Sequence, residues 1–258
     1  DLWYSMRSPI LTLTAEVDGV VVSRRVRLPQ ENAANTFYAA TERQFRAISE
    51  AEAGGTKFSV FAGATGLEAY LVTVHLTASV DLRDTQFTPI SLFRGTFDGN
   101  GNAVKRLRLN YPSSNDIGLF NKLESEVIDT YVTVRNLDIE DVQITANNAV
   151  GAIAGSANQL TLLSNCRVYD SVSGTSLISG NENIGGLIGT TAGTVNGESR
   201  SGVAVSGRNL VGGLIGSSSG PVTGCFATGP VTAEIRNTGT LFGVGGLIGR
   251  VTNGGVSG

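Results

Sequence analysis

Short apolar runs, separated by Gly, Asn, Ser and Thr, make up most of the chain from residue 67 onward. Residues 132–144 show the pattern well, because apolar and polar positions alternate there as they do in a half-buried strand. The runs are too short and too rich in glycine to form helices. This part of the chain is therefore predicted to be all-β.

One of these runs is repeated along the second half of the chain. Residues 184–189, Ile-Gly-Gly-Leu-Ile-Gly, recur with Val in first place at 211–216 and 244–249, and weaker copies begin at Val150 and Ile117. Successive copies are 33, 34, 27 and 33 residues apart. The repeat glycines that we assign a structural role are Gly151, Gly155, Gly185, Gly186, Gly189, Gly212, Gly213, Gly216, Gly245, Gly246 and Gly249.

Repeats this short cannot bury their apolar side chains alone, but stacked copies share a continuous core. We therefore predict a parallel β-helix solenoid over residues 61–258, with coils about 4.8 Å apart and the right-handed path expected of crossover connections. Glycine is expected to take positive φ at the corners and to let backbones pass closely. Strict alternation puts Ile184 and Ile188 on one face and Leu187 on the other, so either a bend reorients the strand or one apolar face is exposed.

The N-terminal part is predicted to contain a hairpin and a cap. Two β-rich runs, Pro9 to Val17 and Val20 to Leu28, flank Asp18-Gly19, a pair that favours a tight β-hairpin turn. We interpret residues 1–36 as this hairpin and a polar linker.

The segment that follows is predicted to be helical. Residues 41–44, Thr-Glu-Arg-Gln, match a capping box at a helix start, and Phe45 and Ile48 give a short amphipathic helix to about Ala53. An uncovered first coil would leave an unpaired strand edge. We therefore interpret residues 37–60 as a capping helix of the solenoid.

The two cysteines provide a geometric test of the stacking. Cys166 and Cys225 lie in corresponding blocks two repeats apart. Two stacking steps separate their Cα atoms by roughly 9–10 Å, whereas a disulfide needs Cα atoms within about 7 Å. We predict two free, buried thiols.

The repeat resembles a known family. Gly-Gly-Leu-Ile-Gly, followed by the block Gly-Cys-Phe-Ala-Thr-Gly at 224–229, resembles the GLUG motif, and residues 93–101 resemble the segment that commonly precedes such repeats. The resemblance covers about residues 80–258. Proteins with this motif include large bacterial surface and secreted proteins, among them adhesins and immunoglobulin A1 peptidases. The resemblance therefore implies an extracellular or bacterial cell-surface location.

The chain stops at Gly258 without an evident cap, so further domains of the same polypeptide are expected.

Composition excludes some classes of protein. Hydrophobic residues are 41% and charged residues 16% of the 258, which is unlike a disordered chain. A net charge of −3, with basic clusters as short as those at 105–108 and 24–27, disfavours nucleic-acid binding. No run of about 18 apolar residues is present, so no membrane span is predicted.

No metal or cofactor site is expected. Zinc peptidases need His-Glu-x-x-His, but the chain has one histidine, His75, which we interpret as lying on the outer face of a strand. Residues 98–102 begin like a calcium loop, yet Ala103 and Leu109 break the pattern, so a turn is predicted. The repeated glycines lack the Gly-Lys-Ser/Thr of a phosphate loop.

The weak catalytic candidates are carboxylates. Glycoside hydrolysis needs two carboxyl groups about 5–10 Å apart, and Asp138, Glu140 and Asp141 form the densest acidic cluster in the coils. The apolar residues interleaved with them favour a half-buried strand with a solvated face instead. The leading hypothesis is a non-catalytic adhesin module or rigid stalk, with a host glycoprotein or polysaccharide as possible partner. The alternatives are a carbohydrate-active β-helix enzyme and a non-catalytic region of a larger immunoglobulin A1 peptidase-like protein.

Overall fold

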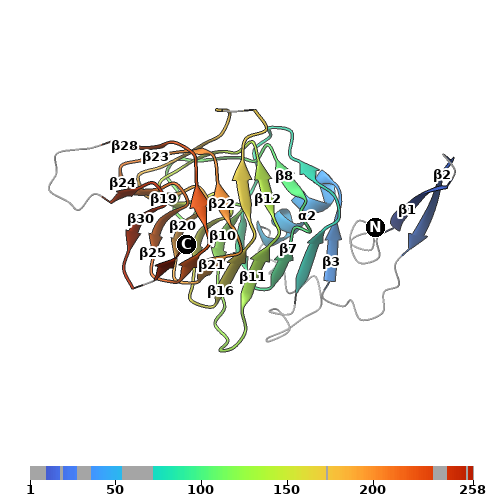
Figure 1. Ribbon diagram of the computed structural model, residues 1–258, viewed down its shortest axis with the longest axis horizontal. Helices are drawn as coiled ribbons and strands as arrows, with labels where there is room; N and C mark the ends of the chain where they lie inside the picture. The colour runs from blue at the N-terminus through green and yellow to red at the C-terminus, as the bar shows by residue number, and fades with distance from the viewer. Residues whose placement is uncertain are drawn as a thin grey trace.

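The structure is a computed structural model that describes residues 10–17, 20–27, 36–53, 72–172, 174–234, 243–253 and 255–257. The predicted parallel β-helix is confirmed (Figure 1). Five parallel sheets stack into a β-solenoid of about six turns. We number the sheets I to V in the order in which a regular turn, beginning at β10, passes through them. In each regular turn the chain passes through sheets I to V and then enters sheet I again, one coil further along.

The strands of sheets I to III have the following bounds. Sheet I contains β6 (Ile90–Phe93), β10 (Phe120–Leu123), β15 (Ala154–Ala157), β20 (Ile188–Thr191), β25 (Ile215–Ser218) and β30 (Ile248–Val251). Sheet II contains β3 (Thr36–Ala39), β4 (Thr73–Leu76), β7 (Thr96–Asp98), β11 (Val132–Arg135), β16 (Thr161–Ser164), β21 (Thr194–Asn196), β26 (Val222–Thr223) and β31 (Val256–Ser257). Sheet III contains β5 (Val80–Asp81), β8 (Ala103–Lys105), β12 (Asp138–Glu140), β17 (Arg167–Tyr169), β22 (Arg200–Ser201) and β27 (Phe226–Ala227).

Sheets IV and V close each turn. Sheet IV contains β9 (Arg108–Tyr111), β13 (Gln143–Ala146), β18 (Leu177–Ser179), β23 (Ala204–Gly207) and β28 (Val231–Ala233). Sheet V contains β14 (Asn148–Val150), β19 (Glu182–Gly185), β24 (Asn209–Gly212) and β29 (Val244–Gly245).

The predicted hairpin is present. β1 (Ile10–Val17) and β2 (Val20–Arg27) pair antiparallel, with Val17 opposite Val20. The turn residues Asp18 and Gly19 lie outside the described residues, as do residues 28–35 of the predicted linker.

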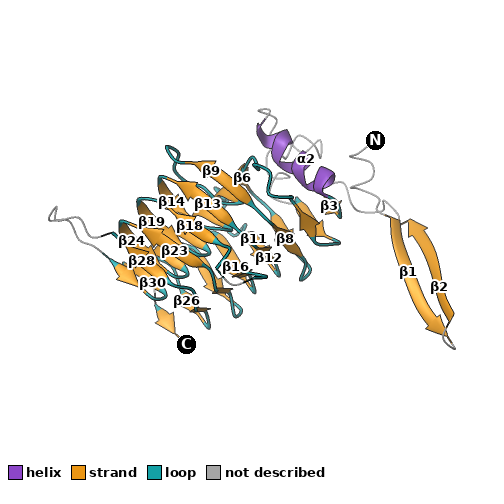
Figure 2. Cartoon of the chain, turned by 90° about the horizontal axis from the view of Figure 1, so that it is seen from above, coloured by secondary structure: helices purple, strands orange, loops and turns teal. Residues whose placement is uncertain are grey.

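The predicted helix is α2 (Glu42–Ala53), which lies at the N-terminal end of the stack (Figure 2). Thr41 caps it, because its Oγ1 accepts the Gln44 amide at 3.3 Å while the Gln44 Oε1 accepts the Ala40 amide at 3.0 Å. Phe45 and Ile48 are fully buried in the solenoid core. Because β3 before the helix already pairs with β4 in sheet II, the first coil begins ahead of the cap.

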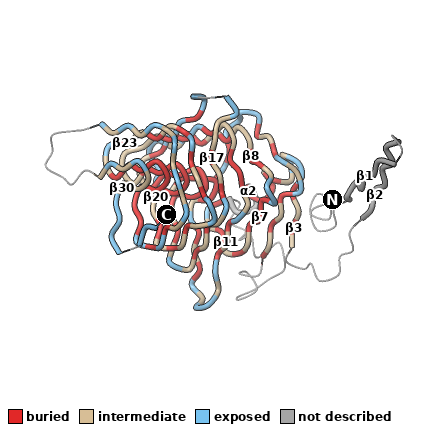
Figure 3. The backbone as a smooth tube through the Cα atoms, viewed as in Figure 1, coloured by how far each residue is buried: buried red, intermediate tan, exposed pale blue. Residues whose placement is uncertain are grey.

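Buried residues recur in successive coils of the stack (Figure 3). Alternate residues of each strand point inward, and parallel pairing places each one beside its counterpart in the next coil. The inward column of sheet II, whose members are at most 1% exposed, consists of Phe37, Val74, Phe97, Val134, Leu163, Val195 and Val222. A column of this kind gives the solenoid a continuous apolar interior.

The repeat glycines differ in part from the prediction, because none of the eleven has a positive φ. All of them except Gly246 are needed for close approach instead. A Cβ on Gly212 would lie 2.0 Å from the Ile215 carbonyl oxygen, one on Gly213 2.2 Å from that of Gly246, and one on Gly189 2.3 Å from the Val150 nitrogen. These glycines let sheets I and V touch backbone to backbone.

Positive φ is found at other positions. In the corner between sheets II and III it falls on Asn136 and Asn165, both at 51°, and then on Gly197 at 65° and Gly224 at 60°. Asparagine tolerates the left-handed region because its short amide side chain bonds locally. The Asn165 Nδ2 donates to the Asn136 Oδ1 at 2.9 Å, so this corner is also tied from coil to coil.

A bend resolves the alternation problem in the repeat. Ile184, Leu187 and Ile188 are all fully buried, and the chain bends at residues 186–187 between β19 and β20. The first alternative is therefore correct, and the motif turns both of its apolar sides into the core.

Coils differ in the length of their corners. Between sheets I and II the chain uses residues 124–131 in one coil and 158–160 in the next. Between sheets III and IV it uses residues 170–176 in one coil and 202–203 in the next. Ile128, Tyr131 and Val172 in the long corners are exposed, whereas the strands keep their register.

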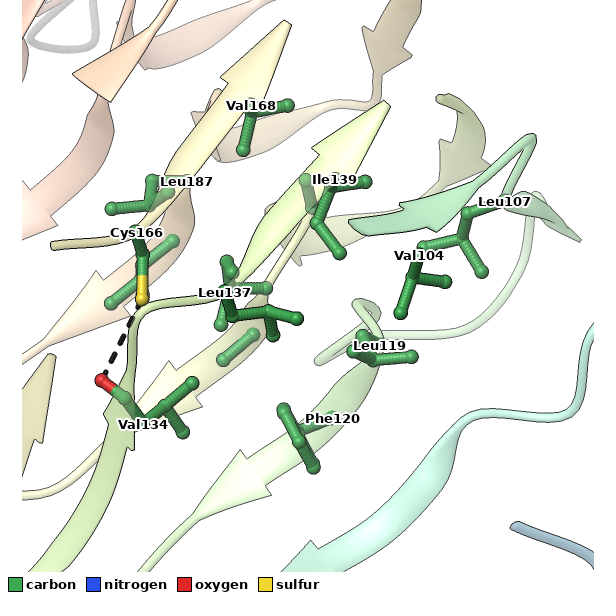
Figure 4. Packing of buried hydrophobic residues seen from close by; sticks show 14 of the residues in the cluster. Val104, Leu107, Leu119, Phe120, Val134, Leu137, Ile139, Cys166, Val168 and Leu187 are labelled. Carbon is green, nitrogen blue, oxygen red and sulfur yellow. Dashed lines mark hydrogen bonds between the residues drawn. The ribbon is translucent and has the colours of Figure 1, made fainter. Parts of the chain in front are cut away.

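Both cysteines are free, as predicted. Cys166 is fully buried, and its thiol contacts the Val134 carbonyl oxygen at 3.6 Å (Figure 4). The prediction that both are buried is wrong for Cys225, which is partly exposed because it precedes β27, the edge strand of sheet III. Ser199 occupies the same corner in the coil between them, so the cysteines are two coils apart.

We expect the two thiols to react at different rates. Burial raises the pKa of Cys166 to about 12, and partial burial also raises the pKa of Cys225. In the native protein at pH 8, a thiol reagent should modify Cys225 slowly and leave Cys166 intact, as read by mass spectrometry of peptides. Both thiols should titrate after unfolding in guanidinium. Equal native rates would contradict the stacked arrangement.

Candidate functional site

The predicted carboxylates lie on the outer face of sheet III. Within β12, Ile139 points into the core, while Asp138 and Glu140 point outward. Parallel pairing sets Asp138 beside Arg167 of β17, and Glu140 between Lys105 of β8 and Tyr169. The register thus brings the acidic cluster against basic side chains from the neighbouring coils.

Asp138 is held by a single guanidinium. The Arg167 Nε donates to its Oδ1 at 2.7 Å, and the Arg167 Nη2 donates to its Oδ2. The Asp138 side chain is 3% exposed and that of Arg167 is 37% exposed. A bidentate pair of this kind fixes both carboxylate oxygens, so neither is free for a substrate.

Glu140 has two partners in adjacent coils. The Lys105 Nζ lies 2.8 Å from its Oε2, and the Tyr169 hydroxyl donates to the same oxygen at 3.3 Å. The hydrogen bond to Glu140 raises the pKa of Lys105, and burial together with the Glu140 and Asp138 charges raises the pKa of Tyr169. Both shifts favour the protonated forms, in which Lys105 and Tyr169 can donate hydrogen bonds to Glu140.

Asp141 occupies the corner after β12 with a φ of 59°. Its carboxylate accepts the Ser171 amide at 2.8 Å, the Ser171 hydroxyl at 2.5 Å and the Thr175 hydroxyl at 3.3 Å. Burial raises the pKa of Asp141, but these hydrogen bonds and the charge of Arg108 outweigh burial, and the net pKa is lowered. A general acid needs the opposite shift.

The lowered pKa of Asp141 predicts a contribution to stability that depends on pH. It is present above the unfolded pKa of an aspartate and is lost as pH falls through the lower folded pKa. Asp141→Asn should therefore lower the melting temperature at pH 7. It should also reduce the difference between the melting temperatures at pH 7 and pH 3. Circular dichroism melts at the two pH values test this. An unchanged difference would mean that Asp141 contributes nothing to acid sensitivity.

The basic cluster at 105–108 is neutralised by acids on the same surface. Arg106 pairs with Asp81 and Asp84, and Arg108 also pairs with Asp84. With the Lys105–Glu140 pair, these contacts tie β5, β8 and β12 of sheet III and the start of β9 into one network. The surface is a lattice of ion pairs between coils, rather than an unpaired basic patch of the kind that binds nucleic acid.

His75 lies on the outward side of β4, as predicted. Its ring stacks on Tyr38 with centroids 5.4 Å apart, and its Nδ1 lies 3.4 Å from the Asn100 Nδ2. Burial lowers the pKa of His75, although the Asp98 charge opposes this shift. Among the described residues, no group of three or more His, Cys, Asp and Glu side chains could hold a metal ion.

The segment 98–102 forms the predicted turn, with positive φ at Asn100 and Gly101. The Asp98 carboxylate accepts the Arg135 Nε at 2.8 Å, the Asn136 Nδ2 at 3.1 Å and the Asn100 amide at 2.9 Å. Its oxygens are thus bonded within the protein.

A groove on the outer face of sheet I was missed in the sequence. It has a volume of about 360 Å³. The signal that could have found it is the residue after the last glycine of each repeat, which points outward on sheet I. That column consists of Ser156, Thr190, Ser217 and Arg250, and the last three line the groove.

Fold and surface together define a parallel β-solenoid whose exterior acidic cluster is used for contacts between coils. No protein-family model and no solved structure matches the chain. The chain is similar to Halomucin from Haloquadratum walsbyi (strain DSM 16790 / HBSQ001), with 36% identity over 102 residues. The match covers 40% of this chain and 1% of Halomucin, so the chain spans a very small part of that relative. No helix among the described residues is long and apolar enough to cross a membrane.

Proposed function

We propose that the chain is a non-catalytic segment of a cell-surface or secreted protein, acting as a rigid stalk or an adhesin module. The observation that carries the proposal is the use of Asp138, Glu140 and Asp141. Each carboxylate is bonded to side chains of an adjacent coil. Groups used in this way stabilise the stack and are poorly suited to proton transfer.

The fold suits a spacer. Coils in the regular part of the stack contact their neighbours through five sheets. The core is continuous along the axis, and α2 covers one end (Figure 2). Elongation of such a solenoid adds length without new long-range contacts. A stalk or adhesin module is the use that this geometry supports best.

An extracellular location is part of the proposal. It is supported by the resemblance of the repeats to the GLUG motif and by the similarity to Halomucin over 40% of the chain. If the chain is part of a larger immunoglobulin A1 peptidase-like protein, it is a non-catalytic region of it, because a single histidine cannot form His-Glu-x-x-His.

A retention assay tests the proposal. The chain is passed over immobilised polysaccharides and glycoproteins, and the eluates are analysed for cleaved products, with Asp138→Asn as a parallel sample. We expect no cleavage by either protein. Retention of both would support an adhesin module, and retention on no surface would support a stalk. Cleavage by the natural chain that is abolished in Asp138→Asn would overturn the proposal in favour of a carbohydrate-active enzyme.

A further inference from the structure

The groove on the outer face of sheet I lies across three successive coils. Thr190 of β20, Ser217 of β25 and Arg250 of β30 stand side by side in the register of the parallel strands. Its other lining residues come from the neighbouring corners and strand ends, and they are Ala157, Asn183, Thr191, Ala192, Ser219 and Thr252. The groove is thus rich in hydroxyl groups and has one cationic side chain.

Arg250 has unused binding capacity. Its Nε donates to the Ser217 Oγ at 3.4 Å, and its guanidinium forms no ion pair with the described residues. On the face of sheet III, Lys105, Arg106 and Arg167 each pair with a carboxylate. Arg200 of the same sheet forms no ion pair with the described residues, but its guanidinium lies over the Phe226 ring. A guanidinium has five donors in a planar fork that fits a carboxylate or sulfate group.

Asn183 contributes a second unpaired group. Its Oδ1 is buried and has no hydrogen-bond partner among the described residues. Asn183 has a φ of 59° at a position where the neighbouring coils also have left-handed residues, Ala149 and Leu210. The backbone conformation is therefore common to this column, whereas the polar side chain at the groove is specific to this coil.

The spacing of the groove fits a sugar chain. Equivalent side chains of adjacent coils are about 4.8 Å apart, close to the length of one pyranose unit in an extended oligosaccharide. Small-molecule sites range over roughly 300–1,000 Å³ and are mostly apolar. A volume of about 360 Å³ lined by hydroxyls, an amide and a guanidinium suits instead a small polyhydroxylated ligand with a negative charge.

We propose that this groove binds an acidic saccharide, with Arg250 contacting its carboxylate or sulfate group and the Thr190 and Ser217 hydroxyls contacting the sugar ring. The proposal deepens the adhesin form of the proposed function by giving it a binding site. It rests on the proposed function in one respect, which is that the bound saccharide is not cleaved.

The experiment is an NMR titration of the ¹⁵N-labelled chain. The probes are tetragalacturonate, a heparin tetrasaccharide, neutral maltotetraose and inorganic sulfate. The test variant is Arg250→Gln, which replaces an exposed side chain and should leave the fold intact. The matched control is Arg200→Gln, since Arg200 also lacks an ion pair among the described residues but lies over Phe226 on sheet III. Thr190→Val is a second, nearly isosteric variant.

We expect one or both acidic tetrasaccharides to shift the amides of Thr190, Ser217 and Arg250, and the preferred probe distinguishes a carboxylate ligand from a sulfated one. Affinity should fall at least about tenfold in Arg250→Gln, because a charge-assisted hydrogen bond is lost. It should fall less in Thr190→Val and stay unchanged in Arg200→Gln.

Three results would overturn the proposal. They are the absence of shifts at the groove with both acidic probes, equal affinity of Arg250→Gln and the natural chain, and binding of inorganic sulfate as tightly as the tetrasaccharides. The first and third results would favour the stalk form of the proposed function, whereas the second would leave an adhesin module that binds through other residues. Appearance of cleaved saccharide during the titration would contradict the proposed function separately, without bearing on where the saccharide binds.

Discussion

Gly213→Ala is expected to lower the melting temperature by roughly 10 °C, corresponding to about 3 kcal/mol in a chain of this size. The new Cβ would lie 2.2 Å from the Gly246 carbonyl oxygen and 2.9 Å from the Ala227 Cβ. The main obstacle is backbone of the next coil, which cannot move aside as the end of a flexible side chain can. Relief would require the two coils to separate, with loss of their pairing.

The repeat provides its own control. Gly246 occupies the same motif position one coil later, and a Cβ there would meet none of the described residues within 4 Å. Neither glycine has a positive φ, so the two alanine variants differ only in what the methyl group contacts. Thermal melts followed by circular dichroism should show Gly246→Ala close to the natural chain. Equal destabilisation of the two variants would mean that glycine is needed here for a reason other than close approach.

Arg167→Gln should cost about 3 kcal/mol of stability, because it leaves Asp138 as a buried carboxylate without its cation. Asp138→Asn should cost less. Arg167 is 37% exposed, so its guanidinium can turn toward water, whereas the Asp138 side chain is 3% exposed and has no such escape. The effects of the two single substitutions are therefore expected to be unequal.

The double variant completes the comparison. Together, Arg167→Gln and Asp138→Asn should be more stable than Arg167→Gln alone, because no buried charge then lacks a partner. Urea unfolding of all four proteins gives the coupling free energy. If Arg167→Gln unfolds at the same urea concentration as the natural chain, the ion pair does not stabilise the coils. The proposed function would then lose part of its support.

Local signals in the sequence predicted the main elements well. The Thr-Glu-Arg-Gln box located the start of α2, and the alternation in 132–144 located β11, β12 and the start of β13. The spacing of the glycine repeats predicted parallel stacking, since each copy must pair with the next to bury its apolar residues. It also placed Cys166 and Cys225 two coils apart.

Side-chain contacts between coils could not be predicted from the sequence in the same way. Asp138 and Arg167 are 29 residues apart, and Lys105 and Glu140 are 35 apart. Pairing them requires the register of each strand, which depends on corner lengths that vary from coil to coil. The role of the repeat glycines was misjudged for a related reason. A glycine at a corner is compatible with both positive φ and close approach, and only the position of the neighbouring coil distinguishes them.

The uneven corners have a consequence for how such a chain can evolve. The corners at 124–131 and 170–176 are longer than the corresponding corners of the next coil, which have three and two residues. The strands on either side nevertheless keep their pairing. Insertions and deletions at these corners can therefore be accepted without any change in the buried residues of the core. One scaffold can acquire, exchange or lose surface loops coil by coil while its length and rigidity are inherited unchanged.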